Sequence, residues 1–581
     1  NTASIGMLVD SGFATTDYYL TKSADGKSVT LTIGAKPTDY VFVTTDGVLS
    51  SYRDYTTGYL AGNSGNTVSI TGSSLTTDIY GAKAASGGDT ADNTVAIAAG
   101  SVTGSVYGAS GGTGGDNNTV TLGASGTDGP TITGNVYAYD GTGVSSFNTV
   151  SVASGSVGGT IYGAKTDTAT YNTVTVNGGT ITSGIYGAYS ISDANGVIEN
   201  NTLNLLNGKV SGAIYGGYAE NGSVGSNVIN LYGTDVSGAS LYGGGGSGSS
   251  FSSNTLNVYT LGNTVANIGN FQNINFYVPE AAKTTENATM LTVTGTADIA
   301  NTAIKAGIAD VTGYSQGQTI TLLTDADGLT GLKSAAVGTL TDSGFAQTGY
   351  YLTKSKDGKS IILTIGTKPT DYVSIVTNGL TSAYPDYDTE YLANTKGNTV
   401  TVTGSTFATD LYGAYASGVE TSDNTVAVSV GTVNASVYGA FGGSSGTNNT
   451  VTLGAAGTDG PTITGDLYAY DGTGITSGNT VTVSSGSVGG AVYGGQAATV
   501  TKSTIDVNGG SITGGIYGGY STSGGSVDEN VINLNAGTVS GNIYGGYSEN
   551  GSVGSNVINL YSTDVSGASL YGGYGGSVDN N

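Results

Sequence analysis

The acidic side chains that recur along the chain are the first candidates for chemistry, because carboxylates serve as general acids, general bases and metal ligands. They recur singly, within turn-like sequences: Asp128 and Asp459 in Thr-Asp-Gly-Pro, Asp140 and Asp471 in Tyr-Asp-Gly-Thr-Gly, and Asp235 and Asp564 in Thr-Asp-Val-Ser-Gly. Asp and Gly both tolerate the backbone angles of tight turns. The pattern therefore favours a structural role for these acids.

Cleavage of a polysaccharide would need clustered carboxylates together with a His, Lys or Arg that acts as base or stabilises charge. The chain has no histidine and no cysteine, and its one arginine, Arg53, is replaced by Pro385 in the duplicated segment described below. We therefore expect no enzyme and no catalytic residues, with a polysaccharide-acting enzyme as the third and least favoured alternative. Acidic turns could hold calcium, but the Gly-Gly-x-Gly-x-Asp series of repeat-type calcium sites is absent, so we expect no cofactor and keep calcium as the alternative.

Charge and composition limit the partners. Lys and Arg number 16 against 41 Asp and Glu, and the net charge of −25 disfavours nucleic acid and acidic membranes. With 101 glycines the chain is rich in turns, yet 37% hydrophobic residues and 40 tyrosines are too many for a disordered linker. No apolar stretch is long enough to cross a bilayer as a helix, so we expect any membrane attachment to lie in a part outside this sequence.

Two repeat lengths organise the residues. Nearly everything between residues 10 and 245 recurs in the second half of the chain; for example, Ser11-Gly12-Phe13-Ala14 returns as Ser343-Gly344-Phe345-Ala346. Within each long repeat, the motif (Ile/Val/Leu)-Tyr-Gly-(Ala/Gly) or a variant of it recurs with a shorter and slightly uneven period. Its tyrosines are Tyr80, Tyr107, Tyr137, Tyr162, Tyr186, Tyr215 and Tyr242, then Tyr412, Tyr438, Tyr468, Tyr493, Tyr517, Tyr544 and Tyr571.

A second recurring motif, Asn-Thr-Val-x-Val or a relative of it, accompanies most of these tyrosines. Its asparagines are Asn93, Asn118, Asn148, Asn172, Asn201, Asn227, Asn424, Asn449, Asn479, Asn530 and Asn556. Apolar residues alternate at period two within these runs, which predicts strands. The stretch of chain between two successive motif tyrosines is too short to bury its own apolar face. Successive units must therefore stack on one another. The sequence therefore predicts an all-β fold made of parallel β-helix (β-solenoid) arrays.

Side-chain parity assigns the two motifs to opposite sides of a strand. Asn93 lies on the same side of its strand as Val95 and Ile97, which places the asparagines inside as a structural ladder. Tyr107 follows the inward Val106 directly in the sequence, so its side chain points to the other side, outward. The outward tyrosines form the candidate interaction face. One interpretation is that these tyrosines serve only to stiffen the solenoid. The other is that they also bind a glycan, a host protein or another copy of the chain. The uneven spacing argues against an ice-binding face.

The long repeat also predicts domains. We expect residues 1–37 to be the tail of a preceding capping module, and 38–262 to form the first β-helix. Residues 263–369 should form a β-rich capping or connecting module, and 370–581 an incomplete second β-helix. Lys36-Pro37 and Lys368-Pro369 mark the expected joints, because proline cannot donate to a central ladder.

The segments Phe276-Tyr277-Val278-Pro279, Met290-Leu291-Thr292-Val293-Thr294-Gly295 and Gly317-Gln318-Thr319-Ile320-Thr321-Leu322-Leu323 resemble the region that closes β-helical passenger domains of autotransporter-like surface proteins. The Asn-Thr-Val and Ile-Tyr-Gly-Gly motifs resemble passengers of large adhesins from anaerobic diderm bacteria. The resemblance implies that the parallel β-helix is right-handed and that the protein is extracellular, on the outer cell surface. We expect it to act as a stalk, adhesin or fibre. Its partners would be a host or bacterial surface glycan or protein, or the chain itself. A self-assembling filament subunit is the alternative.

Overall fold

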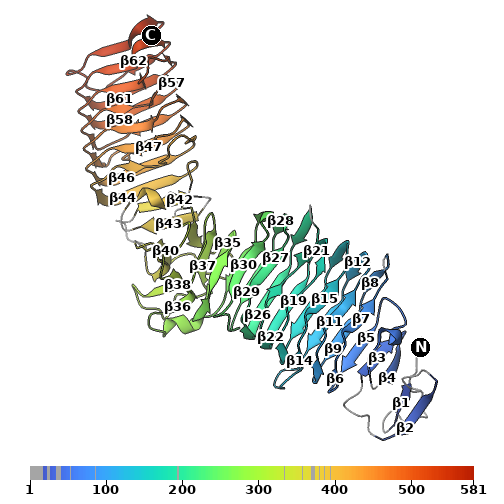
Figure 1. Ribbon diagram of the computed structural model, residues 1–581. Coiled ribbons are helices and arrows are strands. Elements are labelled where there is room, and N and C mark those ends of the chain that lie inside the picture. The colour runs from blue at the N-terminus through green and yellow to red at the C-terminus, as the bar shows by residue number, and fades with distance from the viewer. Residues whose placement is uncertain are drawn as a thin grey trace.

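The structure is a computed structural model that describes residues 18–22, 27–34, 41–52, 54–85, 87–192, 195–332, 334–355, 357–367, 373–377, 380–384, 387–392 and 394–581. About 55% of the chain is strand and 2% is helical, and the strands form a β-solenoid of about 18 stacked turns. Figure 1 shows two columns of coils that run in different directions and meet near β38 to β43. The expected joints Lys36-Pro37 and Lys368-Pro369 lie outside the described residues.

Each coil of the first column contributes strands to three faces. The first face contains β5 (Thr67–Ile70), β9 (Thr94–Ile97), β13 (Thr119–Leu122), β17 (Thr149–Val152), β22 (Thr173–Ile181), β26 (Thr202–Val210), β29 (Val228–Leu231), β32 (Thr255–Val258), β35 (Asn273–Val278), β37 (Ala303–Ile308) and β39 (Ala336–Thr339), with the short strands β6 (Ser74–Leu75), β10 (Ser101–Val102), β14 (Thr131–Ile132) and β18 (Ser156–Val157) beside them.

The second face contains β7 (Ile79–Lys83), β11 (Val106–Ser110), β15 (Val136–Asp140), β19 (Ile161–Tyr162), β20 (Lys165–Thr166), β23 (Ile185–Tyr186), β24 (Tyr189–Ser190), β27 (Ile214–Tyr218), β30 (Ser240–Gly245) and β34 (Asn267–Gly269). The third contains β8 (Asp89–Ala91), β12 (Gly114–Asp116), β16 (Val144–Ser146), β21 (Thr168–Thr170), β25 (Gly196–Glu199), β28 (Asn221–Gly225) and β31 (Gly248–Ser252). A further sheet joins β33 (Asn263–Val265), β36 (Thr289–Val293) and β38 (Thr319–Asp325).

The second column repeats this plan. One sheet contains β44 (Thr399–Phe407), β46 (Thr425–Val433), β49 (Thr450–Leu453), β50 (Thr462–Ile463), β53 (Thr480–Val483), β54 (Ser487–Val488), β58 (Thr504–Ile512), β61 (Val531–Val539) and β63 (Val557–Leu560). The other contains β45 (Leu411–Tyr412), β47 (Val437–Phe441), β48 (Ser445–Thr447), β51 (Leu467–Asp471), β52 (Ile475–Ser477), β55 (Val492–Tyr493), β56 (Gln496–Ala497), β57 (Thr499–Thr501), β59 (Ile516–Ser521), β60 (Val527–Asp528), β62 (Ile543–Gly554) and β64 (Leu570–Asp579).

Equivalent residues of successive coils pair in parallel and in register. In β9 and β13, Thr94 lies opposite Thr119 and Val95 opposite Val120. Burial alternates along these strands: Val95 and Ile97 are buried, whereas Thr94 and Ala96 are partly exposed. The apolar side chains therefore stack on their own equivalents in a continuous core. This arrangement confirms the predicted β-solenoid.

Antiparallel hairpins and short 3₁₀ helices occupy the ends of the columns. The hairpins are β1 (Tyr18–Lys22) with β2 (Val29–Ile33), β3 (Val41–Thr45) with β4 (Val48–Tyr52), β40 (Tyr350–Lys354) with β41 (Ser360–Ile365), and β42 (Val373–Thr377) with β43 (Leu380–Tyr384). The 3₁₀ helices are η1 (Thr57–Tyr59), η2 (Glu280–Lys283) and η3 (Thr389–Tyr391). β3 pairs antiparallel with the first coil strand β5, and β42 pairs in the same way with β44. Each of these two hairpins thus covers a strand edge that would otherwise be open.

The region expected to be a separate capping module continues the first solenoid. β35 pairs in parallel with β32 across the predicted boundary at 262/263, and β37 and β39 extend the same ladder. Antiparallel pairing begins where β41 joins β38. The domain boundaries stay a prediction, but the described strands show no separate fold between residues 263 and 339.

Candidate interaction face

The repeated turn acids lie apart from one another. Asp235 accepts a hydrogen bond at 2.7 Å from the hydroxyl of Ser237 in its own turn, and one at 2.8 Å from Nζ of Lys209 on the preceding coil. Asp564 accepts from the backbone N–H of Ser566, and Asp128 is exposed. Among the described residues, no three Asp or Glu side chains lie close enough together to hold a metal ion. These contacts give the acids turn-stabilising roles and assemble no carboxylate cluster.

The fourteen motif tyrosines form two continuous stacks, one on each solenoid, which we call the tyrosine ladder. In the first, neighbouring ring centroids are 4.6 to 5.2 Å apart and all but the last pair are within 8° of parallel. In the second, the distances are 4.5 to 5.1 Å. These distances match the spacing of adjacent strands, because each ring sits on the same position of successive coils. The stack therefore follows directly from the in-register pairing.

Stacking hides most of each ring. The sequence predicts outward side chains, yet Tyr80, Tyr137 and Tyr468 are buried, and most of the other ladder tyrosines are only partly exposed. Only Tyr571, on the last coil strand β64, reaches 40% exposure. Each ring inside the stack has its two faces covered by its neighbours, so the solvent meets ring edges and hydroxyls. A ligand at this surface would contact a ribbon of edges and hydroxyl groups, and could not stack on a ring face.

A second row of rings, three residues further along the chain, was not predicted. Tyr189 stacks on Tyr218 at 5.0 Å, and Tyr520, Tyr547 and Tyr574 stack at 4.9 Å. These rings stand edge-on to the ladder, as Tyr186 and Tyr189 do at 87°. The available signal was the extension of the ladder motif to Tyr-Gly-(Ala/Gly)-Tyr, which recurs in the late coils of both solenoids. The second row widens the aromatic surface of these coils.

Among the described residues, lysines lie beside rings in the early part of the first ladder. Lys83 Nζ lies 4.4 Å from the Tyr80 ring centroid, and Lys165 Nζ lies 5.8 Å from that of Tyr137. Lys165 also lies 3.7 Å from the Asp140 carboxylate. In the second solenoid Gln496 takes the place of Lys165 and donates to Asp471 at 3.1 Å. The two ladders share geometry but differ in charge.

Burial controls ionisation along the ladder. Desolvation raises the pKa of Tyr438 to about 12, with a further contribution from the negative charge of Asp410. Desolvation likewise raises the pKa of Tyr162, Tyr186 and Tyr215. Burial also raises the pKa of the Asp140 carboxyl, an effect that Lys165 opposes. These tyrosines are therefore neutral at physiological pH, and any binding to them uses hydrogen bonds and apolar edges.

The motif asparagines form a buried amide ladder beneath the turn in each solenoid. Asn93 Nδ2 donates to Asn118 Oδ1 at 2.9 Å, and the same oxygen accepts from the Asn93 backbone N–H at 3.2 Å. This pair of hydrogen bonds repeats through Asn148, Asn172 and Asn201. Asn66, Asn254, Asn398 and Asn581, which are not among the predicted asparagines, extend the two ladders. Stacked amides thus satisfy buried polar groups between coils.

The residue before each of these ladder asparagines adopts the left-handed conformation. Asp92, Asn117, Phe147 and Tyr171 have φ values of 55° to 58°. This conformation costs roughly 1–2 kcal/mol for a residue that carries a Cβ. The two hydrogen bonds to each asparagine oxygen hold the turn in place in spite of that cost. The turn explains why the asparagine points inward at every coil.

One coil interrupts the asparagine ladder. Ser503 stands where the first solenoid has Asn172. Its backbone N–H donates to Asn530 Oδ1 at 2.9 Å, but its buried Oγ has no hydrogen-bond partner. Asn479, the preceding rung, instead donates its side-chain N–H to Thr476 Oγ1. The second solenoid therefore contains a defect at this coil that the first lacks.

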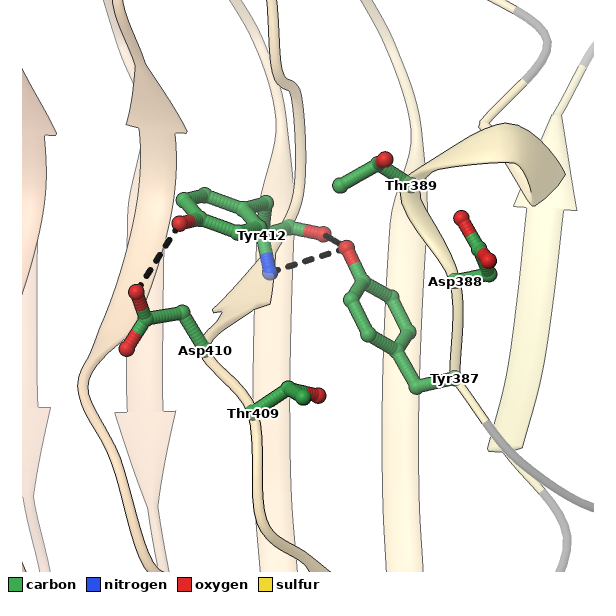
Figure 2. Close-up of a pocket in the computed structure, with 6 residues that line it drawn as sticks. All are labelled: Tyr387, Asp388, Thr389, Thr409, Asp410 and Tyr412. Carbon is green, nitrogen blue, oxygen red and sulfur yellow. Dashed lines mark hydrogen bonds between the residues drawn. The ribbon is translucent and has the colours of Figure 1, made fainter.

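A tyrosine hydroxyl closes the open start of each tyrosine ladder. The Tyr387 hydroxyl donates to the Tyr412 backbone oxygen at 2.5 Å and accepts from the Tyr412 N–H at 2.9 Å, beside a shallow hollow lined by Asp388, Thr389, Thr409 and Asp410. Figure 2 shows these bonds and the Tyr412 hydroxyl pointing at Asp410. Tyr55 contacts Tyr80 in the same way in the first solenoid. The hollow is thus part of a duplicated strand cap.

No protein-family model matches this chain, and neither a curated protein nor a solved structure matches it. No helix in the described residues is long and apolar enough to cross a membrane. The fold and the two ladders are therefore the basis for any functional conclusion.

Proposed function

We propose that this chain is an extracellular structural and adhesive surface protein, a stiff tandem β-solenoid that carries an interaction face on its tyrosine ladder. The observation that supports the proposal is the uninterrupted stack from Tyr80 to Tyr242 and again from Tyr412 to Tyr571. A face that is copied at every coil offers many equivalent weak contacts, which add up by avidity. The partner would be a surface glycan or protein that hydrogen-bonds to phenol groups.

Stiffness is the second part of the proposal. Parallel hydrogen bonds join each coil to the next, and the amide ladder adds two bonds per coil inside. Such a column resists bending because every coil contacts its neighbours over its whole perimeter. A stiff column keeps the tyrosine ladder in line and holds it away from the anchoring surface. A filament subunit is the alternative, in which the chain's own copies are the partner.

The test separates hydroxyl recognition from stiffening. Changing Tyr162, Tyr186 and Tyr215 together to Phe keeps the stacked rings and removes three hydroxyls. We expect weaker binding to a panel of immobilised neutral and acidic glycans and to intact cells, with an unchanged melting temperature. The matched control changes Tyr232, Tyr259 and Tyr277 to Phe, because these rings also stack, at 4.2 and 4.5 Å, but off the ladder.

Two results would contradict the proposal. Unchanged binding in the ladder variant would leave the tyrosines with a purely stiffening role. Equal loss in the ladder and control variants would mean that binding does not depend on this face. Concentration-dependent filaments in negative-stain micrographs of the wild-type chain, without binding to any glycan or cell, would favour the filament alternative.

A further inference from the structure

The hairpin β1–β2 is duplicated in structure as well as in sequence. Tyr18 pairs with Ile33 and Lys22 with Val29; in the second hairpin, Tyr350 pairs with Ile365 and Lys354 with Ile361. The two hairpins therefore have the same register, residue for residue. The strands that the second hairpin contacts therefore indicate the kind of strand that the first hairpin can contact.

The second hairpin joins the two solenoids. Its strand β41 adds antiparallel to β38, the last strand of that sheet in the first solenoid, with Ile320 opposite Leu363. Ile361, Leu363 and Ile365 are at most 5% exposed as a result. Its other strand, β40, lies against β43 at the start of the second solenoid. One strand of the hairpin thus covers the end of one solenoid, and its other strand meets the beginning of the next.

Within the described residues, the first hairpin makes only half of these contacts. β1 lies beside β4, with Thr21 opposite Ser51, just as β40 lies beside β43. On β2, however, Val29 is 55% exposed, Leu31 53% and Ile33 77%. These are the counterparts of the three buried residues of β41. An alternating apolar strand with an open edge is a surface that proteins normally cover.

We propose that β2 is a docking edge for the end of another solenoid unit, and that its occupant is a strand of the Thr319–Asp325 type added in antiparallel register. The duplicated joint supplies the chemistry of that occupant, which is the sequence of β38: Ile320, Leu322 and Leu323, with a register shift between Thr321 and Leu323, flanking threonines and an acid at the end. Strand addition gives affinity through backbone hydrogen bonds and specificity through alternate side chains. The proposal is independent of any ligand of the tyrosine ladder.

A second copy of this chain is not the occupant in this proposal. The β38 edge of each copy is already paired with its own β41. Two copies could pair in this way only if one of them released its own hairpin. The partner that fits is another repeat of the same kind, in which the strand equivalent to β38 has an unpaired edge.

The experiment uses the full chain and a fluorescent synthetic peptide with the sequence of residues 315–327, which spans β38. We expect saturable binding that falls at least tenfold in Leu31→Asp and is retained in Thr30→Asp, whose side chain lies on the opposite side of the same strand. Leu31 is exposed, so the variant should melt like the wild type. A peptide of scrambled sequence is the control.

Register gives a second measurement. The chain has no cysteine, so Thr32→Cys introduces a single thiol. The duplicated joint places Thr364, the counterpart of Thr32, opposite Thr319. A peptide with cysteine at position 319 should form a disulfide with this variant at least tenfold faster than one with cysteine at position 324. Equal rates, binding that survives Leu31→Asp, or dimers formed through β2 without peptide binding would each overturn the proposal.

Discussion

At the scale of single residues, the asparagine ladder determines how well neighbouring coils are held together. Ser503 leaves one buried hydroxyl without a partner where Asn172 donates to Asn201 Oδ1 at 2.9 Å. We expect Ser503→Asn to stabilise its coil by about 1 kcal/mol, because it completes the chain of amides between Asn479 and Asn530. The reverse change, Asn172→Ser, should destabilise the matching coil by about 1–3 kcal/mol.

Native-state hydrogen exchange of the flanking strands β53 and β58 measures the first change, and that of β17 and β22 the second. Faster exchange in Ser503→Asn would show that the coil has no room for the amide. Equal exchange in wild type and Asn172→Ser would show that the ladder contributes nothing to stability.

The buried and partly buried tyrosines lead to a prediction about pH. Burial raises the pKa of Tyr139, Tyr438 and Tyr470 to about 12, against about 10 in an unfolded chain. The stability that these rings contribute is therefore fully present below pH 10 and is lost as the pH rises from 10 through 12. We expect part of the phenolate absorbance to appear only together with the loss of the β-sheet circular dichroism signal.

The same titration in denaturant is the control, since unfolded tyrosines should ionise as one group near pH 10. A folded chain whose tyrosines all ionise near pH 10, with the circular dichroism unchanged, would contradict the burial of these rings.

At the scale of the strand, the glycine that follows most of the ladder tyrosines allows the coils to approach one another; Ala138 and Ala469 stand in its place after Tyr137 and Tyr468. A Cβ on Gly187 would lie 2.2 Å from the Gly216 backbone oxygen of the next coil. Gly187→Ala should therefore force the coils apart and cost about 1–3 kcal/mol. Gly62→Ala is the matched control, because a Cβ there meets nothing within 4 Å. Thermal denaturation should show a loss only for Gly187→Ala, and equal melting of the two variants would contradict the close approach.

Strand-scale features were largely predictable from sequence. Alternation around Val95 and Ile97 indicated strands, and the shared parity of Asn93 indicated its inward position. The burial of Tyr80 and Tyr137 was not predictable, because it arises from stacking between coils and not from the direction of a side chain within one strand. The continuation of the solenoid through β35 and β37 was not anticipated either, because the Tyr-Gly motif stops before this region while the parallel strand pairing goes on.

At the scale of the whole molecule, a solenoid transmits order only between neighbouring coils. Val176 is fully buried, so Val176→Asp should cost roughly 3–5 kcal/mol by placing an unpaired charge in a dry core. Thr175→Asp is the matched control, because its counterpart in the second solenoid is already Asp506, which accepts from Asn533. Limited proteolysis should cut Val176→Asp near the changed coil and leave the distant coils intact. Global unfolding of that variant would contradict the coil-by-coil account.

The central claim is that binding is spread over a repeated face and does not reside in one pocket. The most direct measurement is adhesion of the full chain as one, three and then six ladder tyrosines are changed to Phe, starting from Tyr162, Tyr186 and Tyr215. The account predicts little effect from one change and a progressive loss with each further set, because the contacts are weak and equivalent. Complete loss from a single substitution, at one tyrosine or at Asp140, would identify a discrete site and contradict the account.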